Sequence, residues 1–103
     1  MTTTRNAWRV GALVSGNPRQ PEFHDTLGWI YYKKQMYEQA LKPLADAASM
    51  VPKNPTVQFH LGLTYARLGE DAKARKALQY ALKLAPGFEG ATEAKQVLAS
   101  LVY

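Results

Sequence analysis

The hydrophobic positions along this chain recur with a helical period. Within several stretches the apolar residues fall three and four positions apart, and proline or glycine separates one stretch from the next. This pattern predicts amphipathic α-helices. Helices are expected from Pro21 to about Lys34, from Tyr37 to about Met50, from Pro55 to Leu68, from Glu70 to about Leu84 and from Glu89 to about Leu101.

A longer period relates the first two of these helices to the next two. A set of residues recurs with a constant offset of 34 positions. Its members are Leu27, Gly28, Tyr31, Ala40, Leu44, Ala47 and Pro52, which return as Leu61, Gly62, Tyr65, Ala74, Leu78, Ala81 and Pro86. A fixed period of this length indicates a stack of supersecondary units. The sequence therefore predicts one unit at residues 21–54 and a second at residues 55–88.

The spacing of Leu-Gly-x-x-Tyr, then Ala-x-x-x-Leu, then Pro resembles the tetratricopeptide repeat. The resemblance implies an all-α fold in which antiparallel helical hairpins stack as a right-handed solenoid. Residues 89–103 then correspond to a C-terminal capping helix. One side of that segment is apolar and the other is polar, as a terminal cap requires.

Residues 1–20 are expected to contain a polar tail and part of an upstream repeat. Val10 and Leu13 stand 34 positions before Leu44 and Ala47. An unrelated N-terminal helix that covers the same flank is the alternative. Because about three units are usually needed for a stable stack, the chain is expected to be marginally stable alone, to dimerise, or to be the end of a longer array.

Two irregularities are visible in the first unit. Gln35 stands in the turn where the second unit has Gly69. If both turns need a left-handed residue, Gln35 is strained by about 1 kcal/mol. Pro43 lies inside the second helix and removes one backbone hydrogen bond, so we expect a bend there.

Composition and charge narrow the class of protein. The 103 residues are 47% hydrophobic and contain no cysteine, which excludes wholesale disorder and disulfides. No apolar run reaches the ~18 residues of a membrane span, and the start lacks the pattern of a secretory signal. We therefore expect a cytoplasmic protein, or a piece of a longer one, without a membrane partner.

The net charge is +5 and modestly favours acidic partners. Four basic residues lie along the fourth predicted helix: Lys73, Arg75, Lys76 and Lys83. A solvated helix face explains them, and a nucleic-acid site would need a denser basic stripe. Nucleic acid is therefore not the partner that the sequence favours.

Residues suited to catalysis are scattered. His24 and His60 are the only histidines, and neither has a second ligand at metal spacing. Gly28 and Gly62 are packing glycines of the repeat rather than parts of a phosphate loop. We expect no enzymatic activity, no cofactor and no metal site.

The first helix of each unit has apolar residues on two sides. Taking 100° per residue, Trp29 and Tyr32 lie opposite the side that Leu27 and Tyr31 define. The resemblance implies that this inner side lines a concave surface for partner proteins. The residues at the family's contact places are Glu22, Asp25, Trp29, Tyr32 and Lys33 in the first unit, and Thr56, Phe59, Leu63, Ala66 and Arg67 in the second.

These residues predict a groove for an apolar or amphipathic protein segment, with Lys33 and Arg67 on its rim. If four of the apolar side chains expose on the order of 100 Å² each, the patch is large enough for a binding site of at best micromolar affinity. Asp25 and Trp29 disfavour the family's carboxylate clamp, which needs Lys and Asn. The alternatives are that Trp29 and Phe59 fill the inside of the superhelix, or that the groove or the N-terminal flank forms a homodimer.

Overall fold

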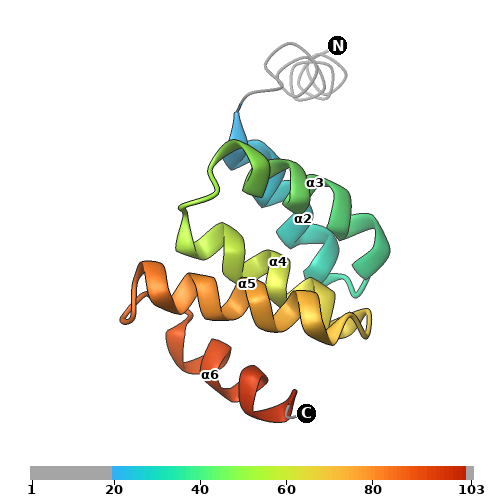
Figure 1. Ribbon diagram of the computed structural model, residues 1–103. Coiled ribbons are helices and arrows are strands. Elements are labelled where there is room, and N and C mark those ends of the chain that lie inside the picture. The colour runs from blue at the N-terminus through green and yellow to red at the C-terminus, as the bar shows by residue number, and fades with distance from the viewer. Residues whose placement is uncertain (1–19, 102–103) are drawn as a thin grey trace, which may run out of the picture.

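The structure is a computed structural model that describes residues 20–101, and this part of the chain folds entirely into α-helices and their connections (Figure 1). The helices are α2 (Pro21–Lys33), α3 (Tyr37–Met50), α4 (Pro55–Arg67), α5 (Asp71–Leu84) and α6 (Ala91–Ser100). The helix positions that the hydrophobic pattern predicts are confirmed, and the ends lie close to the predicted ones.

The helices stack in the order of the sequence. Helices α2 and α3 form one antiparallel hairpin, and α4 and α5 form the next. The first hairpin packs on the second mainly through α3 and α4, and α6 packs on α5 and α4 at the other end (Figure 1). The predicted all-α arrangement of stacked hairpins is therefore confirmed.

Two buried clusters hold this stack together. One joins the two hairpins and contains Ala40, Leu44, Ala47, Ala48, Val57 and Leu61. The other joins α4, α5 and α6 and contains Phe59, Leu63, Ala74, Leu78, Ala81, Ala94 and Leu101. Alanine recurs at these positions because small side chains let the helices of a hairpin approach closely. Each unit thus buries its apolar face only with the help of its neighbour.

Local chemistry determines where several helices begin and turn. Proline occupies the start of α2 and α4, where its missing N–H has no helical partner in any case. The Asn54 side chain accepts a hydrogen bond from the Val57 N–H at 3.1 Å and caps α4. Gln35 has φ 62° and Gly69 has φ 78°, so both turns have a left-handed residue, which is the condition under which strain at Gln35 is expected. Pro43 lies buried inside α3, and the bend expected there stays a prediction.

The side of α2 that carries Leu27 and Ile30, which we call its outer side, is more exposed among the described residues than the equivalent side of α4. Leu27 is 37% exposed and Ile30 is 48% exposed. The residues 34 positions later, Leu61 and Thr64, are 8% and 0% exposed because the first hairpin packs on them. The upstream repeat predicted in residues 1–20 falls, apart from Gln20, outside the described residues.

The helices in residues 20–101 are all too short or too polar to reach across a bilayer. The cytoplasmic location expected from the sequence stays a prediction.

Candidate functional site

A row of aromatic rings runs along the inner side of the stack, from α4 across α2 to the start of α3. The Trp29 ring stacks on the His60 imidazole at a centroid distance of 3.9 Å and on the Tyr32 ring at 4.8 Å. Tyr32 meets the edge of Tyr37 at 5.3 Å. We call these four side chains the aromatic row. Stacking on both neighbours holds the half-buried Trp29 in one orientation.

His60 at one end of the row is tied to the first hairpin by an ion-pair contact. Its Nδ1 lies 2.8 Å from Oδ1 of Asp25, and both side chains are largely buried. Because a carboxylate only accepts hydrogen bonds, the Nδ1–H donates and Nε2 is left as the acceptor in the neutral imidazole. The contact links α2 to α4 and fixes the ring that Trp29 stacks on.

The sequence analysis missed this pair. It considered Asp25 as a partner contact and His60 as an isolated histidine, because the two residues are 35 positions apart. The 34-residue period was the available signal, since it places the start of α4 beside the start of α2. In the structure the Asp25 carboxylate is engaged within the chain.

Two cations, Lys33 and Arg67, lie beside the aromatic row. Lys33 Nζ lies 5.1 Å from the centroid of the Trp29 ring. Arg67 Nε donates to the Tyr32 hydroxyl at 3.3 Å, and its guanidinium lies 5.8 Å from the Tyr37 ring centroid. The hydrogen bond to Tyr32 raises the pKa of Arg67 further above its ordinary value. Arg67 is therefore a permanent cation held beside Tyr32.

The structure corrects the predicted exposure of Phe59 and Leu63. Phe59 is 6% exposed and Leu63 is 2% exposed, so neither offers the area of about 100 Å² that the sequence analysis assumed. The residues around them come from α6 and the turn before it, among them Ala94, Leu101 and Phe88. The capping helix thus covers the inner side of α4, and Phe59 and Leu63 belong to the core.

What remains on the inner side is a groove between the aromatic row and α6. It consists of two cavities of about 420 Å³ and about 310 Å³, and both are lined by Glu93 of α6. Trp29, His60 and Glu89 line the first cavity, and Tyr32 and Arg67 line the second. The largely buried Phe59 also borders the first cavity, and Leu63 borders the second. We call this pair of cavities the inner groove. Its walls carry the acidic Glu89 and Glu93, just before and within α6, and the cation Arg67 at the end of α4.

Glu22, a predicted contact residue, lies away from the inner groove. It is exposed at the start of α2 and lines a smaller cavity of about 150 Å³ with Asp25 and Thr56. The structure thus brings Trp29, Tyr32, Lys33 and Arg67 together and leaves Glu22 outside. Glu89, Glu93 and His60 are groove residues that the sequence analysis did not select.

Comparison with known proteins identifies the repeat. Residues 55–88 match the family described as the tetratricopeptide repeat. The chain carries tetratricopeptide repeats. It is 31% identical over 88 residues to the general transcriptional corepressor ssn6 of Schizosaccharomyces pombe, a match that covers 79% of this chain and 8% of that protein.

Solved tetratricopeptide structures have the same arrangement of helices. The type III secretion chaperone SycD of Yersinia enterocolitica, in complex with a peptide of the translocator YopD, superimposes with a TM-score of 0.78 at 23% identity. This match covers 89% of the chain and 73% of SycD. MamA from MSR-1 superimposes with a TM-score of 0.74 at 26% identity, over 97% of the chain and 56% of MamA. The tetratricopeptide fold is typical of proteins that bind other proteins rather than of enzymes.

Proposed function

We propose that this chain is a protein-interaction scaffold that docks an amphipathic segment of a partner protein in the inner groove. The observation that carries the proposal is Trp29, which is half-buried, stacks on Tyr32 and His60, and borders a cavity of the groove. A rigid aromatic side chain offers contact area at little cost in conformational entropy. The similarity to SycD, which was crystallised with a bound peptide, supports the proposal.

The charges of the inner groove define the segment that would fit. An apolar side chain of the partner packs against Trp29, a basic side chain lies toward Glu93, and an acidic side chain lies toward Arg67. Since Phe59 and Leu63 are withdrawn into the core, the apolar contact area is smaller than the sequence suggests. We therefore expect affinities of about micromolar or weaker for this module alone.

Replacement of Trp29 by alanine is the direct test. Peptides selected from a displayed random library on the wild-type chain are expected to combine an apolar residue with both charge signs. Their affinity for Trp29→Ala, measured by fluorescence anisotropy, should fall by about 10–100-fold, because the anchor of the groove is lost. Circular dichroism should show that the helical content is retained.

Ile30→Ala is the matched control for this experiment. Ile30 is the next residue of α2, is 48% exposed and points away from the aromatic row. Its replacement should leave peptide affinity unchanged. Equal affinity of the wild type and Trp29→Ala for the selected peptides would rule out docking on the aromatic row.

Self-association through the outer side of α2 is the second candidate function. The exposure of Leu27 and Ile30, whose counterparts in the second unit are buried, favours this flank over the groove as a contact between copies. Light scattering across a range of concentrations should then show a dimer that Ile30→Glu converts to a monomer. A monomer at all concentrations removes this candidate and leaves the groove proposal untouched.

A further inference from the structure

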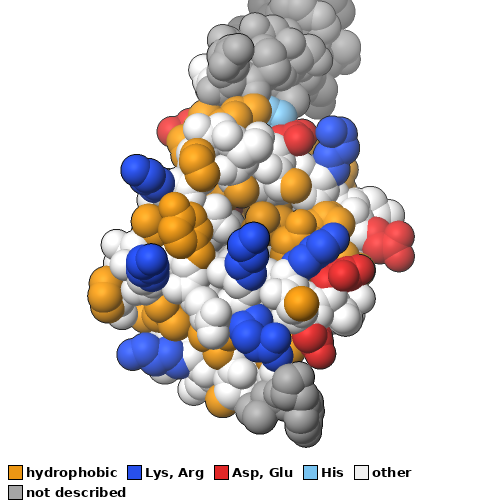
Figure 2. Space-filling view, in the orientation of Figure 1, with side chains coloured by type: hydrophobic (Ala, Val, Ile, Leu, Met, Phe, Trp, Pro, Cys, Tyr) orange, Lys and Arg blue, Asp and Glu red, His pale blue; other side chains and the backbone are white. Residues whose placement is uncertain are grey.

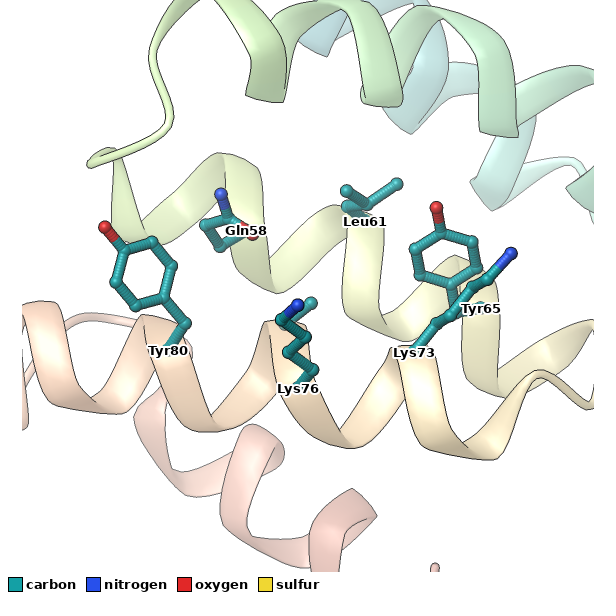
Figure 3. Close-up of a pocket in the computed structure, with 7 residues that line it drawn as sticks. Gln58, Leu61, Tyr65, Lys73, Lys76 and Tyr80 are labelled. Atoms are coloured by element: carbon teal, nitrogen blue, oxygen red, sulfur yellow. The ribbon is translucent and has the colours of Figure 1, made fainter.

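A cavity of about 530 Å³ lies on the side of the α4–α5 hairpin that faces away from the aromatic row. Figure 3 shows Lys73, Lys76 and Tyr80 rising from α5 toward Gln58, Leu61 and Tyr65 of α4, with α3 running above them. Ala77 completes the lining. The volume lies in the range of sites that accommodate a ligand or one or two side chains of a partner.

The wall of this cavity is largely apolar and aromatic. Leu61 is 8% exposed and Ala77 is 7% exposed, so both contribute buried surface at the bottom. The rings of Tyr65 and Tyr80 stand at the two ends (Figure 3). An apolar side chain of a partner would therefore find packing surface there, and the tyrosine hydroxyls would remain at the polar rim.

The cations beside the cavity lack a carboxylate partner. Lys73 and Lys76 are exposed, and Lys73 Nζ lies 5.6 Å from the Tyr65 ring centroid. Among residues 20–101 the ion pairs are Lys42 with Asp46 and His60 with Asp25, and neither involves these two lysines. The face that α3 and α5 form carries blue side chains around orange ones, and most of the red side chains lie at its right-hand edge (Figure 2).

The first hairpin carries different side chains at the positions equivalent to Lys73 and Tyr80. The residues 34 positions before Lys73, Lys76 and Tyr80 are Gln39, Lys42 and Asp46. In the first hairpin Lys42 Nζ lies 3.4 Å from the Asp46 carboxylate, which neutralises it. In the second hairpin the acid is replaced by Tyr80 and the glutamine by Lys73. The same position in the repeat has thus become cationic and aromatic.

Arg75 does not extend this site, because it donates a hydrogen bond to the backbone carbonyl of Leu101 and so faces the end of α6. Lys83 does not line the cavity. The remaining lysines of α5 are sparser than the stripe that binding along a nucleic-acid backbone needs. A second copy of this chain is a poor occupant as well, because its net charge is +5.

We propose that the cavity between Tyr65 and Tyr80 is a second docking site, which takes an acidic protein segment with an apolar or aromatic anchor. The anchor packs on Leu61, Ala77 and the two tyrosine rings. Carboxylates on either side of it pair with Lys73 and Lys76. This site is independent of the inner groove, so the two can bind different segments at the same time.

A peptide with a central phenylalanine flanked by aspartates is the probe for this site. We expect it to shift the backbone amide resonances of Tyr65, Ala77 and Tyr80, and to bind more weakly as the salt concentration rises. The same peptide with asparagine in place of aspartate should bind at least about tenfold more weakly, since the attraction to the lysines is lost.

Charge changes in the protein complete the test. Lys73→Glu with Lys76→Glu, and separately Tyr80→Asp, which copies Asp46 of the first hairpin, should each lower affinity for the acidic peptide by about tenfold or more. Lys95→Glu, which reverses an exposed charge on α6 away from this cavity, is the control and should keep binding within about twofold. Helical content and melting temperature verify that each variant folds.

Three results with the peptides would overturn the proposal. They are shifts confined to Trp29 and its neighbours, equal affinity for the aspartate and asparagine peptides, or wild-type affinity in the Lys73→Glu, Lys76→Glu variant. Tighter binding of single-stranded oligothymidylate than of the acidic peptide would also overturn it, because the lysines would then serve a nucleic acid.

Discussion

Replacing Gly28 with alanine is expected to lower the free energy of unfolding by about 1–3 kcal/mol. A Cβ at this position would overlap Leu44 Cγ and would lie 2.7 Å from Leu44 Cδ2 and 3.2 Å from the Ala40 carbonyl oxygen. Leu44 is fully buried at the centre of the cluster that joins the hairpins, so it has little room to move. Urea denaturation monitored by circular dichroism measures the change.

A double-mutant cycle with Leu44 tests the stated cause. Leu44→Ala alone should cost about 2–5 kcal/mol, because it leaves a cavity in the core. In the Gly28→Ala, Leu44→Ala variant the clashing atoms are gone, so the combined cost should be less than the sum of the two. Additive costs would show that the overlap with Leu44 is not what makes glycine necessary.

The second hairpin offers an internal repetition of this experiment. A Cβ at Gly62 would lie 2.8 Å from both Leu78 Cγ and Leu78 Cδ2. Gly62→Ala should therefore be destabilising by a similar amount and should show the same coupling to Leu78→Ala. Agreement between the hairpins would establish that the recurring glycine is needed because it packs directly against a buried leucine of the second helix, Leu44 or Leu78.

Replacing Phe59 with alanine is expected to cost about 3–5 kcal/mol of stability. The ring is 6% exposed, meets Phe88 edge-on at a centroid distance of 5.4 Å, and closely approaches Gly90 at the start of α6. Its removal leaves a cavity beneath the capping helix. The loss is a large share of the 5–15 kcal/mol that a domain of ordinary stability has, so the melting temperature should fall by well over 10 °C.

Trp29→Ala is the variant whose stability and peptide affinity should be compared with those of Phe59→Ala. Trp29 is only half-buried, so its removal should cost less stability than that of Phe59 while it weakens peptide binding by about 10–100-fold. The two aromatic residues thus separate into a core residue and a groove residue. A Phe59→Ala variant that melts like the wild type would mean that α6 does not depend on this contact.

Much of the fold follows from local chemistry along the chain. The helical period marks the helices, and proline, Asn54 and Gly69 mark their ends. The 34-residue offset relates the hairpins and places Gln35 at the position equivalent to Gly69, where the structure has a left-handed residue in both turns. These features depend on residues that are close in sequence or related by one constant offset.

The candidate site depends on contacts that no such rule specifies. A helical pattern shows that the inner side of α4 is apolar, but the pattern is the same whether a partner or the chain itself covers it. Only the packing of α6 on α4 shows that Phe59 and Leu63 are covered within the chain. The pairing of Asp25 with His60 and the hydrogen bond from Arg75 to the Leu101 carbonyl likewise follow from how helices face one another. Side-chain periodicity assigns each residue to a face of its helix, and tertiary packing decides what that face meets.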